Sequence, residues 1–458
     1  MEGFLYPKSV AVIGASADPL KGGYALVSNM KDKFLDRLYP VNPRSVEICG
    51  LHPFKRVKDV PEIVDLAIVF VPAHSVPAVL EECGASGIRR VMIQSAGFAE
   101  AGEKGLALQE MCLSIARRFE IRLWGPNCMG VVSGRSGMVA SFMPSYMWQG
   151  YLKPGDVSLI VQSGMLSAVF LVQILRDGYF GLNNACSIGN RCDVNECDLL
   201  EYFSHDPHTA VVAMYIESIS DVPRFRSAVL SLHKPIVLVK GGTTAEGAQA
   251  AMSHTASLAQ STLIAEGFFR QLGIHRAFDF LEMADLTRAL TLWKGRQGGN
   301  MVGVVTFSGA SGIVATDHII HHGMRLASLS RETIEAVESI FPSWVRPQHP
   351  VDIWPAIERV GRRNAYTVTL KALMLDPQVE GIYLHVYVDS IILQEVLDFV
   401  MPLRGSKKPV AIWAIGDTQC FRLLREKVEP MGIPVYAEIE GGVKALALMT
   451  NSRASLPH

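Results

Sequence analysis

The sequence lacks an excess of charge of either sign. Its 458 residues include 43 Lys and Arg against 44 Asp and Glu, which leaves a formal net charge of -1. A protein that holds nucleic acid or an anionic membrane through electrostatics normally carries a basic excess. We therefore expect neither partner, and chemistry on a small molecule becomes the leading class of function.

The sequence also lacks a recognisable export signal and an uninterrupted apolar run. The first residues, MEGFLYPKSVAVIG, contain no basic region followed by an apolar segment and a cleavage site. The most apolar stretch, VSLIVQSGMLSAVFLVQIL, is broken by Gln162, Ser163, Gly164 and Gln173. Since a membrane span needs about 20 mostly apolar residues, we predict a buried strand, a turn and a helix here. The expected location is the cytoplasm, without membrane attachment.

Neither cysteine nor histidine shows the spacing of a metal site. The eight cysteines form no CxxC pair and no disulfide framework, which favours reduced thiols. Three of them lie close together, but their gaps match no standard zinc site: Cys186, Cys192 and Cys197. Three histidines have helical spacing but no matching acidic or cysteine partner, which favours a solvated helix face: His318, His321 and His322. We therefore expect no bound metal on this chain.

Short apolar strands alternate with longer helical segments along the whole chain, which is typical of parallel α/β sheets. Apolar runs end in Gly, Pro, Ser or Asn, which places polar loops at the carboxyl ends of the strands, where such sheets bind ligands. The stretch MPSYMWQGYLKPGD and the link GRQGGN divide the pattern into three blocks. We predict an α/β fold of three consecutive doubly wound domains, over residues 1–130, 150–295 and 300–458.

The first strand leads into a candidate phosphate loop. Gly14, Ala15 and Ser16 follow the run VAVI, and a glycine pair precedes the next helix, so backbone N–H groups could hold a phosphate. The glycine spacing is not that of a dinucleotide-binding loop. The second strand ends in Asn42, Pro43 and Arg44, and it offers no acid for a ribose diol. Arg44 suits a phosphate, so NAD is disfavoured.

A series of motifs in one order carries a family resemblance. They are GAS, YPVNP, VFVPA, SAGFAE, GPNCMG, VQSGMLS, SIGNRCDV, YIESISD, KGGTTAEGAQAAMSHTASLAQ and HPVDIW. The chain resembles the α subunit of NDP-forming acyl-CoA synthetases, of the ADP-forming acetate–CoA ligase type, related to the succinyl-CoA synthetase α subunit. The resemblance implies a Rossmann-like CoA-binding domain followed by two flavodoxin-like CoA-ligase domains.

The resemblance also implies catalytic residues. His254, in SHT, matches the histidine that the family phosphorylates, and a neutral imidazole is a suitable nucleophile. Glu217, in YIE, matches the glutamate that orients and stabilises this ring. Ser163 and Gly164 open a helix after a strand, where exposed N–H groups suit phosphate or phosphohistidine.

CoA binding is implied for the loops of the first domain, and Cys128 is expected to be a pocket residue near the CoA thiol, not a nucleophile. The residues are Gly14, Ser16, Pro43, Arg44, Val71, Pro72, Asn127 and Cys128. Departures from the common motifs, such as SHTASLAQ and SGMLS, leave the shape of the acyl pocket open. The region of Trp344, His349 and Trp354 is unusually bulky.

Nothing in the chain resembles the ATP-grasp domains that bind nucleotide in this family. We therefore expect an ATP-grasp β subunit as partner, carrying ATP or ADP and Mg²⁺, while this chain binds CoA and a small carboxylic acid. The expected reaction joins acid, CoA and ATP to give acyl-CoA, ADP and phosphate, reversibly. Two alternatives stay open: a CoA- or acyl-CoA-binding regulatory protein without ligase activity, because fold does not guarantee function, and an NAD-linked oxidoreductase.

Overall fold

The structure is a computed structural model that describes residues 1–458 except 45, 220, 245, 248, 250–261 and 451–458. The chain forms two compact units, Met1–Thr287 and Arg288–His458. Three sheets, all mostly parallel, follow one another along the chain. The prediction of three successive α/β blocks is therefore confirmed.

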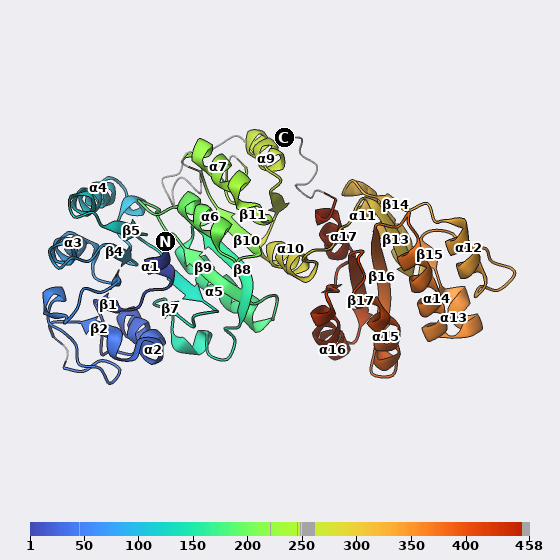
Figure 1. Ribbon diagram of the computed structural model, residues 1–458, viewed down its shortest axis with the longest axis horizontal. Helices are drawn as coiled ribbons and strands as arrows, with labels where there is room; N and C mark the ends of the chain where they lie inside the picture. Colours follow the sequence, from blue (N-terminus) through green and yellow to red (C-terminus); the bar gives the residue numbers. More distant parts are fainter. Residues whose placement is uncertain (45, 220, 245, 248, 250–261, 451–458) are drawn as a thin grey trace. The chain divides into compact units, whose positions relative to one another are not determined.

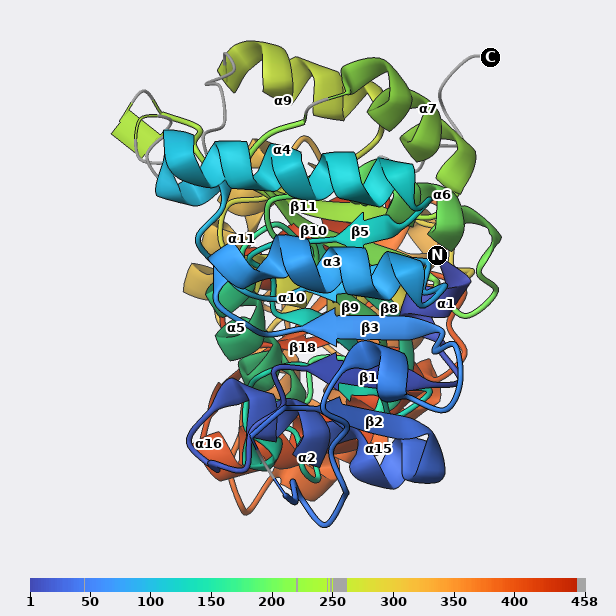
Figure 2. The same ribbon diagram turned by 90° about the vertical axis from the view of Figure 1, so that its left-hand side faces the viewer.

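The first sheet has the strand order β2-β1-β3-β4-β5, and all of its strands are parallel. Its strands are β1 (Val10–Ile13), β2 (Leu38–Val41), β3 (Leu66–Val69), β4 (Arg90–Ile93) and β5 (Arg122–Trp124). Its helices are α1 (Glu2–Leu5), α2 (Gly22–Phe34), α3 (Val76–Ala85) and α4 (Glu103–Arg118). Helices α3 and α4 lie side by side on one face and α2 lies on the other (Figures 1 and 2). Because both faces are covered, β1 and β3 are short, fully buried apolar runs.

The second sheet has the order β12-β11-β10-β8-β9-β6-β7. Its strands are β6 (Gly130–Ser133), β7 (Val139–Ala140), β8 (Pro154–Val161), β9 (Leu182–Ser187), β10 (Val211–Ile216), β11 (Ile236–Lys240) and β12 (His275–Ala277). Its helices are α5 (Gly164–Arg176), α6 (Glu196–His205), α7 (Val222–Leu232), α9 (Thr262–Gln271) and α10 (Phe280–Leu292). Strand β6 runs antiparallel to β9 and β7. Strands β6 and β7 therefore belong to the second sheet, although both precede residue 150, at which the second domain was predicted to begin.

The apolar stretch from Val157 forms the end of β8, a turn and α5, as predicted. Among the described residues, no helix has both the length and the apolar character that crossing a bilayer requires.

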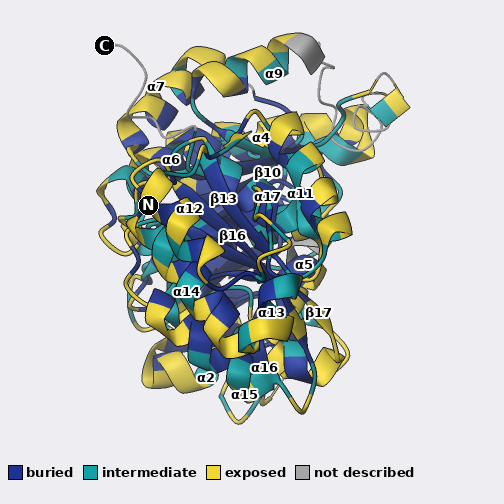
Figure 3. Ribbon diagram, turned by 90° about the vertical axis from the view of Figure 1, so that its right-hand side faces the viewer, coloured by how far each residue is buried: buried dark blue, intermediate teal, exposed yellow. Residues whose placement is uncertain are grey.

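The third sheet lies in the second unit, with the order β14-β13-β16-β17-β18 and β15 paired to β13. Its strands are β13 (Met301–Thr306), β14 (Arg325–Leu326), β15 (Val351–Asp352), β16 (Gly381–Val388), β17 (Val410–Gly416) and β18 (Val435–Tyr436). Its helices are α11 (Gly309–His321), α12 (Arg331–Glu338), α13 (Trp354–Val360), α14 (Arg362–Leu375), α15 (Leu393–Val400), α16 (Thr418–Val428) and α17 (Ile439–Leu448). Strands β13 and β16 are buried between helices whose outer faces are exposed (Figure 3).

Asn195 fixes the beginning of α6 through a reciprocal cap. Its Oδ1 accepts from the backbone N–H of Cys197, at 2.9 Å, and of Asp198, while Asp198 Oδ2 accepts from the Asn195 N–H at 3.0 Å. We expect Asn195→Ala to lower the free energy of unfolding by about 1 kcal/mol, because two helix N–H groups lose their acceptor. Urea unfolding followed by circular dichroism measures this change. Ser75→Ala is the matched control, because Ser75 begins α3 without a side-chain cap; equal losses in both variants would contradict the assignment.

Candidate active site

The loop after β1 is closely packed around Gly14. This glycine has a φ of +93°, and a Cβ atom built on it would lie 2.2 Å from the carbonyl oxygen of Phe70. A Cβ on Gly23, in the first turn of α2, would lie 2.2 Å from the carbonyl oxygen of Gly14. Glycine is required at both positions because backbone approaches backbone there. The helix end and the loop therefore lie as close together as a phosphate loop needs.

The loops after β2 and β3 lie next to this loop, because β1 pairs with both strands. Asn42 Nδ2 donates to the carbonyl oxygen of Ala15 at 2.6 Å, and Asn42 Oδ1 accepts from the backbone N–H of Arg44 at 2.8 Å. The Arg44 side chain is exposed. The structure thus brings six predicted CoA residues to the carboxyl ends of three adjacent strands: Gly14, Ser16, Pro43, Arg44, Val71 and Pro72.

Asn127 and Cys128 lie in the passage from β5 to β6. Asn127 has a positive φ of 57°, its backbone N–H donates to the Ser95 carbonyl at 2.9 Å, and its Nδ2 donates to Asn190 Oδ1 at 3.3 Å. The thiol of Cys128 donates to the Ile93 carbonyl at 3.4 Å. Burial raises the pKa of Cys128 to about 12, so the thiol stays protonated near neutral pH. A protonated, buried thiol agrees with the predicted pocket role and not with a nucleophile.

The amino end of α5 lies against this passage. Ser163 is the N-cap of α5, and a Cβ atom on Gly164 would lie 3.4 Å from the carbonyl oxygen of Asn127. Gly164 and the passage at Asn127 and Cys128 border a pocket of about 360 Å³, lined by Phe70, Gln94, Ser95, Ala96, Asn127, Cys128, Phe142 and Gly164. The rings of Phe70 and Phe142 stack with centroids 5.5 Å apart and form its apolar side. The pocket therefore joins the helix end predicted for phosphate to the loop predicted for the CoA thiol.

Glu217 follows β10, and only one of its two carboxylate oxygens accepts a hydrogen bond from the described residues. Its Oε1 accepts from the Tyr215 hydroxyl at 3.3 Å, and its backbone carbonyl accepts from Lys240 Nζ at 2.7 Å. Its Oε2 is buried and has no hydrogen-bond partner among the described residues. A buried carboxylate oxygen without a donor is costly, so the site suits an N–H donor brought by another group. His254 lies outside the described residues.

Three polar residues that the sequence analysis did not assign to the site hold these loops together: Gln162, Asn190 and Arg191. Gln162 Oε1 accepts from the Glu217 N–H at 2.6 Å, and Gln162 Nε2 donates to the Ser218 carbonyl at 2.9 Å. Arg191 Nη1 donates to both carboxylate oxygens of Glu196 at 3.1 Å, and its Nη2 donates to Ser218 Oγ at 2.7 Å. Asn190 Nδ2 donates to Gln109 Oε1 at 3.1 Å and to a second acceptor, Glu100. Asn190 and Arg191 both lie in the motif SIGNRCDV, so this motif was the sequence signal that could have identified them.

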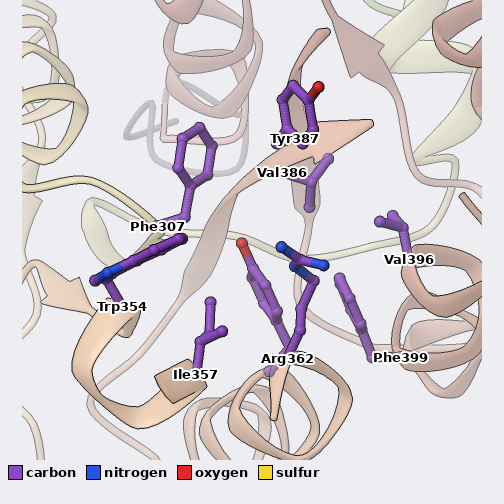
Figure 4. A pocket seen from close by; sticks show the side chains of 9 residues that line it. Phe307, Trp354, Ile357, Arg362, Val386, Tyr387, Val396 and Phe399 are labelled. Atoms are coloured by element: carbon purple, nitrogen blue, oxygen red, sulfur yellow. The ribbon is translucent and has the colours of Figure 1, made fainter. Parts of the chain in front are cut away.

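The second unit contains its own pocket of about 260 Å³, shown in Figure 4. It is lined by Phe307, Trp354, Ile357, Arg362, Tyr366, Val386, Tyr387, Val396 and Phe399. Tyr366 and Phe399 stack with ring centroids 4.1 Å apart. Arg362 Nη1 is 3.4 Å from Glu395 Oε2. One cation among aromatic and aliphatic side chains suits an anion with an apolar group.

The three bulky residues noted in the sequence, Trp344, His349 and Trp354, have different surroundings in the structure. Trp354 lines the pocket in Figure 4, whereas Trp344 is 75% exposed. His349 Nε2 accepts from the Val304 N–H at 2.8 Å, and its Nδ1 lies 2.9 Å from the Ala327 carbonyl, to which it donates. Burial lowers the pKa of His349 to about 4, which keeps the ring neutral. His349 therefore bridges two backbone segments and is structural.

Comparisons with known proteins agree with this geometry. Residues 8–134 match the CoA binding domain family, and residues 154–290 match the succinyl-CoA ligase like flavodoxin domain. These matches cover the first sheet and all of the second sheet except β7, and they define the class as a CoA-ligase chain.

The full-length relatives define the family more narrowly. The chain is 34% identical to acetate–CoA ligase [ADP-forming] I subunit alpha of Pyrococcus furiosus, over 98% of this chain and 97% of that protein. It is 33% identical to acetate–CoA ligase [ADP-forming] II of Archaeoglobus fulgidus, over 97% of this chain and 66% of that protein. A solved structure of dinucleotide forming acetyl-coenzyme A synthetase 1 from Ca. Korarchaeum cryptofilum, in complex with phosphate and ADP, has a TM-score of 0.86. It is 28% identical and covers 98% of this chain and 96% of its own.

The chain therefore belongs to the family of ADP-forming acyl-CoA synthetases, and it aligns with an α subunit over almost its entire length. It spans 66% of the A. fulgidus relative and about half of two further relatives, at 48% and 50%. The predicted resemblance is confirmed. The ligase names agree with the main functional prediction and not with the regulatory or oxidoreductase alternatives.

The protonated state of Cys128 can be tested by alkylation. With a pKa of about 12, roughly one thiol in ten thousand is ionised at pH 8. We expect iodoacetamide at pH 8 to leave Cys128 unmodified in the folded protein, while the half-buried Cys49 reacts first. Peptide mass spectrometry measures both sites, and the urea-unfolded chain, in which Cys128 becomes reactive, is the control. Rapid modification of Cys128 in the folded chain would show that it is an activated thiol.

Proposed function

We propose that this chain is the CoA-binding, phosphohistidine-carrying subunit of an ADP-forming carboxylate–CoA ligase. The observation that carries the proposal is the contact between the α5 amino end at Gly164 and the passage containing Asn127 and Cys128, on one pocket. A phosphate-binding helix end beside a loop for the thiol end of CoA is the arrangement that acyl transfer from an acyl phosphate to CoA needs. Family membership supports the same reaction.

The reaction proceeds through two activated intermediates. An imidazole nitrogen of His254 accepts the γ-phosphoryl group of ATP, and ADP leaves. The carboxylate of the acid then attacks this phosphorus, which gives an acyl phosphate and frees the imidazole. The sulfur of CoA attacks the acyl carbon, the bond to the phosphate oxygen breaks, and the thiol proton passes to the released phosphate. Each step exchanges one activated bond for another, so the series of reaction steps is reversible.

Glu217 is the positioning residue for His254 in this proposal. Its buried Oε2 lacks a donor among the described residues, while its Oε1 and its backbone are already held by Tyr215, Gln162 and Lys240. An imidazole N–H would supply the missing donor. That hydrogen bond fixes the tautomer of the ring and stabilises the positive charge that develops on phosphorylation.

CoA occupies the carboxyl ends of β1, β2 and β3 in this proposal. The loop at Gly14 and Ser16 and the amino end of α2 provide N–H groups for a phosphate. The exposed Arg44 provides a cation beside them. Pro43, Val71 and Pro72 provide apolar contacts, and the thiol end extends to Asn127 and Cys128.

The partner is an ATP-grasp β subunit that holds the nucleotide and its Mg²⁺, in a hetero-oligomer with this chain. The subunit name of the P. furiosus relatives supports a partner of this kind. We place the protein in the cytoplasm, because all eight cysteines are free thiols.

The phosphohistidine is tested by labelling from both directions. Radiolabelled ATP with the ATP-grasp subunit, or radiolabelled phosphate with an acyl-CoA, should give an acid-labile, base-stable adduct on this chain. We expect His254→Ala to remove the adduct completely. Glu217→Gln should lower its yield partly, because Glu217 orients the ring without bonding to phosphorus. His205→Ala and Glu201→Gln, two exposed positions, are the controls. An undiminished adduct in His254→Ala would refute the assignment.

We further propose that the pocket of the second unit selects an acid with an aromatic or branched apolar group. Its volume of about 260 Å³ exceeds the ~150 Å³ of an engineered protein cavity that binds benzene, so it admits a ring. Arg362, which also pairs with Glu395, supplies the positive charge for a carboxylate, and Trp354, Tyr366 and Phe399 supply the apolar surface.

Calorimetry with simple acids tests this selection. We expect benzoate or phenylacetate to bind the chain more tightly than acetate, and Arg362→Met to weaken that binding about tenfold or more, because the carboxylate loses its charge-assisted partner. Arg363→Met is the matched control, since Arg363 follows directly in α14 and pairs with Asp398. Tighter binding of acetate than of the aromatic acids would contradict the proposed selection. Equal loss of binding in Arg362→Met and Arg363→Met would also contradict it.

A further inference from the structure

Two helices of the second unit bring three metal-ligating side chains together. His318 lies in the last turn of α11, and His322 is the residue that closes this helix. Glu440 lies in the first turn of α17, which packs beside α11. One ligand atom from each residue lies within 4.8 Å of the other two, and His322 Nε2 is 3.1 Å from Glu440 Oε1. The acidic partner that the histidine spacing lacked in the sequence is therefore Glu440.

We propose that His318, His322 and Glu440 form a binding site for one transition-metal dication of the Zn²⁺ or Co²⁺ type. The site lies in the second unit and does not depend on the ligase chemistry proposed above. Its three members are half-buried, so an ion can reach them from solvent and still lose part of its hydration shell. The bound ion would join the carboxyl end of α11 to the amino end of α17.

The donor set determines which ions fit. Two imidazole nitrogens and one carboxylate oxygen are a familiar set for Zn²⁺, with a fourth position left for water. Imidazole also suits Co²⁺, Ni²⁺ and Cu²⁺. Mg²⁺ and Ca²⁺ require mostly oxygen ligands, and they are excluded here.

The carboxyl end of α11 attracts a cation to this site, whereas the ammonium group of Lys444 repels it. The carboxyl end of α11 carries the negative end of the helix dipole, which attracts a cation. Lys444 Nζ lies 3.3 Å from Glu440 Oε1 and competes with the ion. The side chain of Lys444 must turn away when the metal binds.

Calorimetry of the untagged, chelator-treated full chain tests the site. We expect one equivalent of Zn²⁺ to bind, and excess Mg²⁺ not to compete. His318→Ala and Glu440→Gln should each weaken the binding about tenfold or more, because each removes a ligand. His321→Ala is the matched control, since His321 lies on the same turn but outside the group. Binding that is unchanged in both ligand variants would refute the site.

Lys444→Gln gives a test that loss of folding cannot imitate. Removing the competing cation should make Zn²⁺ bind about two- to fivefold more tightly. With Co²⁺, the wild-type chain should show a visible d–d spectrum without a thiolate charge-transfer band, which separates this site from the eight cysteines. A strong thiolate band, or weaker binding in Lys444→Gln, would assign the bound metal to another place in the chain.

Discussion

The arrangement of the first unit depends on one short connection, the five residues 125–129 between β5 and β6. Strand β5 belongs to the first sheet and β6 to the second, so this connection fixes the carboxyl edge of one sheet against the other. The indole Nε1–H of Trp124 strengthens it by donating to the Ser187 carbonyl at 2.7 Å, at the end of β9. Because Asn127 and Cys128 lie on this connection, the pocket beside Gly164 follows from how the two sheets are joined.

Two glutamates in the first unit, Glu196 and Glu217, differ in how their buried carboxylate oxygens are paired. Glu196 is fully buried, and Arg191 satisfies both of its oxygens. A buried pair of this kind contributes little net stability, but it fixes geometry, and here it holds the Ser218 loop through Arg191. Glu217, one residue before Ser218, keeps one oxygen without a donor among the described residues. The satisfied carboxylate thus supports the position of the unsatisfied one.

Local signals in the sequence were sufficient for the three blocks of alternating strands and helices and for the polar loops after the main strands. The interruption at Gln162 to Gly164 predicted a strand, a turn and a helix, and β8 and α5 have those positions. Contacts between distant segments left no such signal. From the sequence, Glu196 is expected to be an exposed acid in the first turn of a helix, but in the structure it is buried and pairs with Arg191. Glu440 follows His322 by 118 residues, so no spacing connects them, and the two-residue β7 is too short to show a period.

The close packing at Gly14 has a consequence for the cost of binding. Neither Gly14 nor Gly23 has room for a side chain, and Asn42 holds the loop between them from the neighbouring strand. A loop held in this way has few conformations to lose when a ligand arrives, so little of the binding energy is spent on ordering it. The entropy lost on association then comes mostly from the incoming molecule, and the affinity of this edge depends on how rigid that molecule is before it binds.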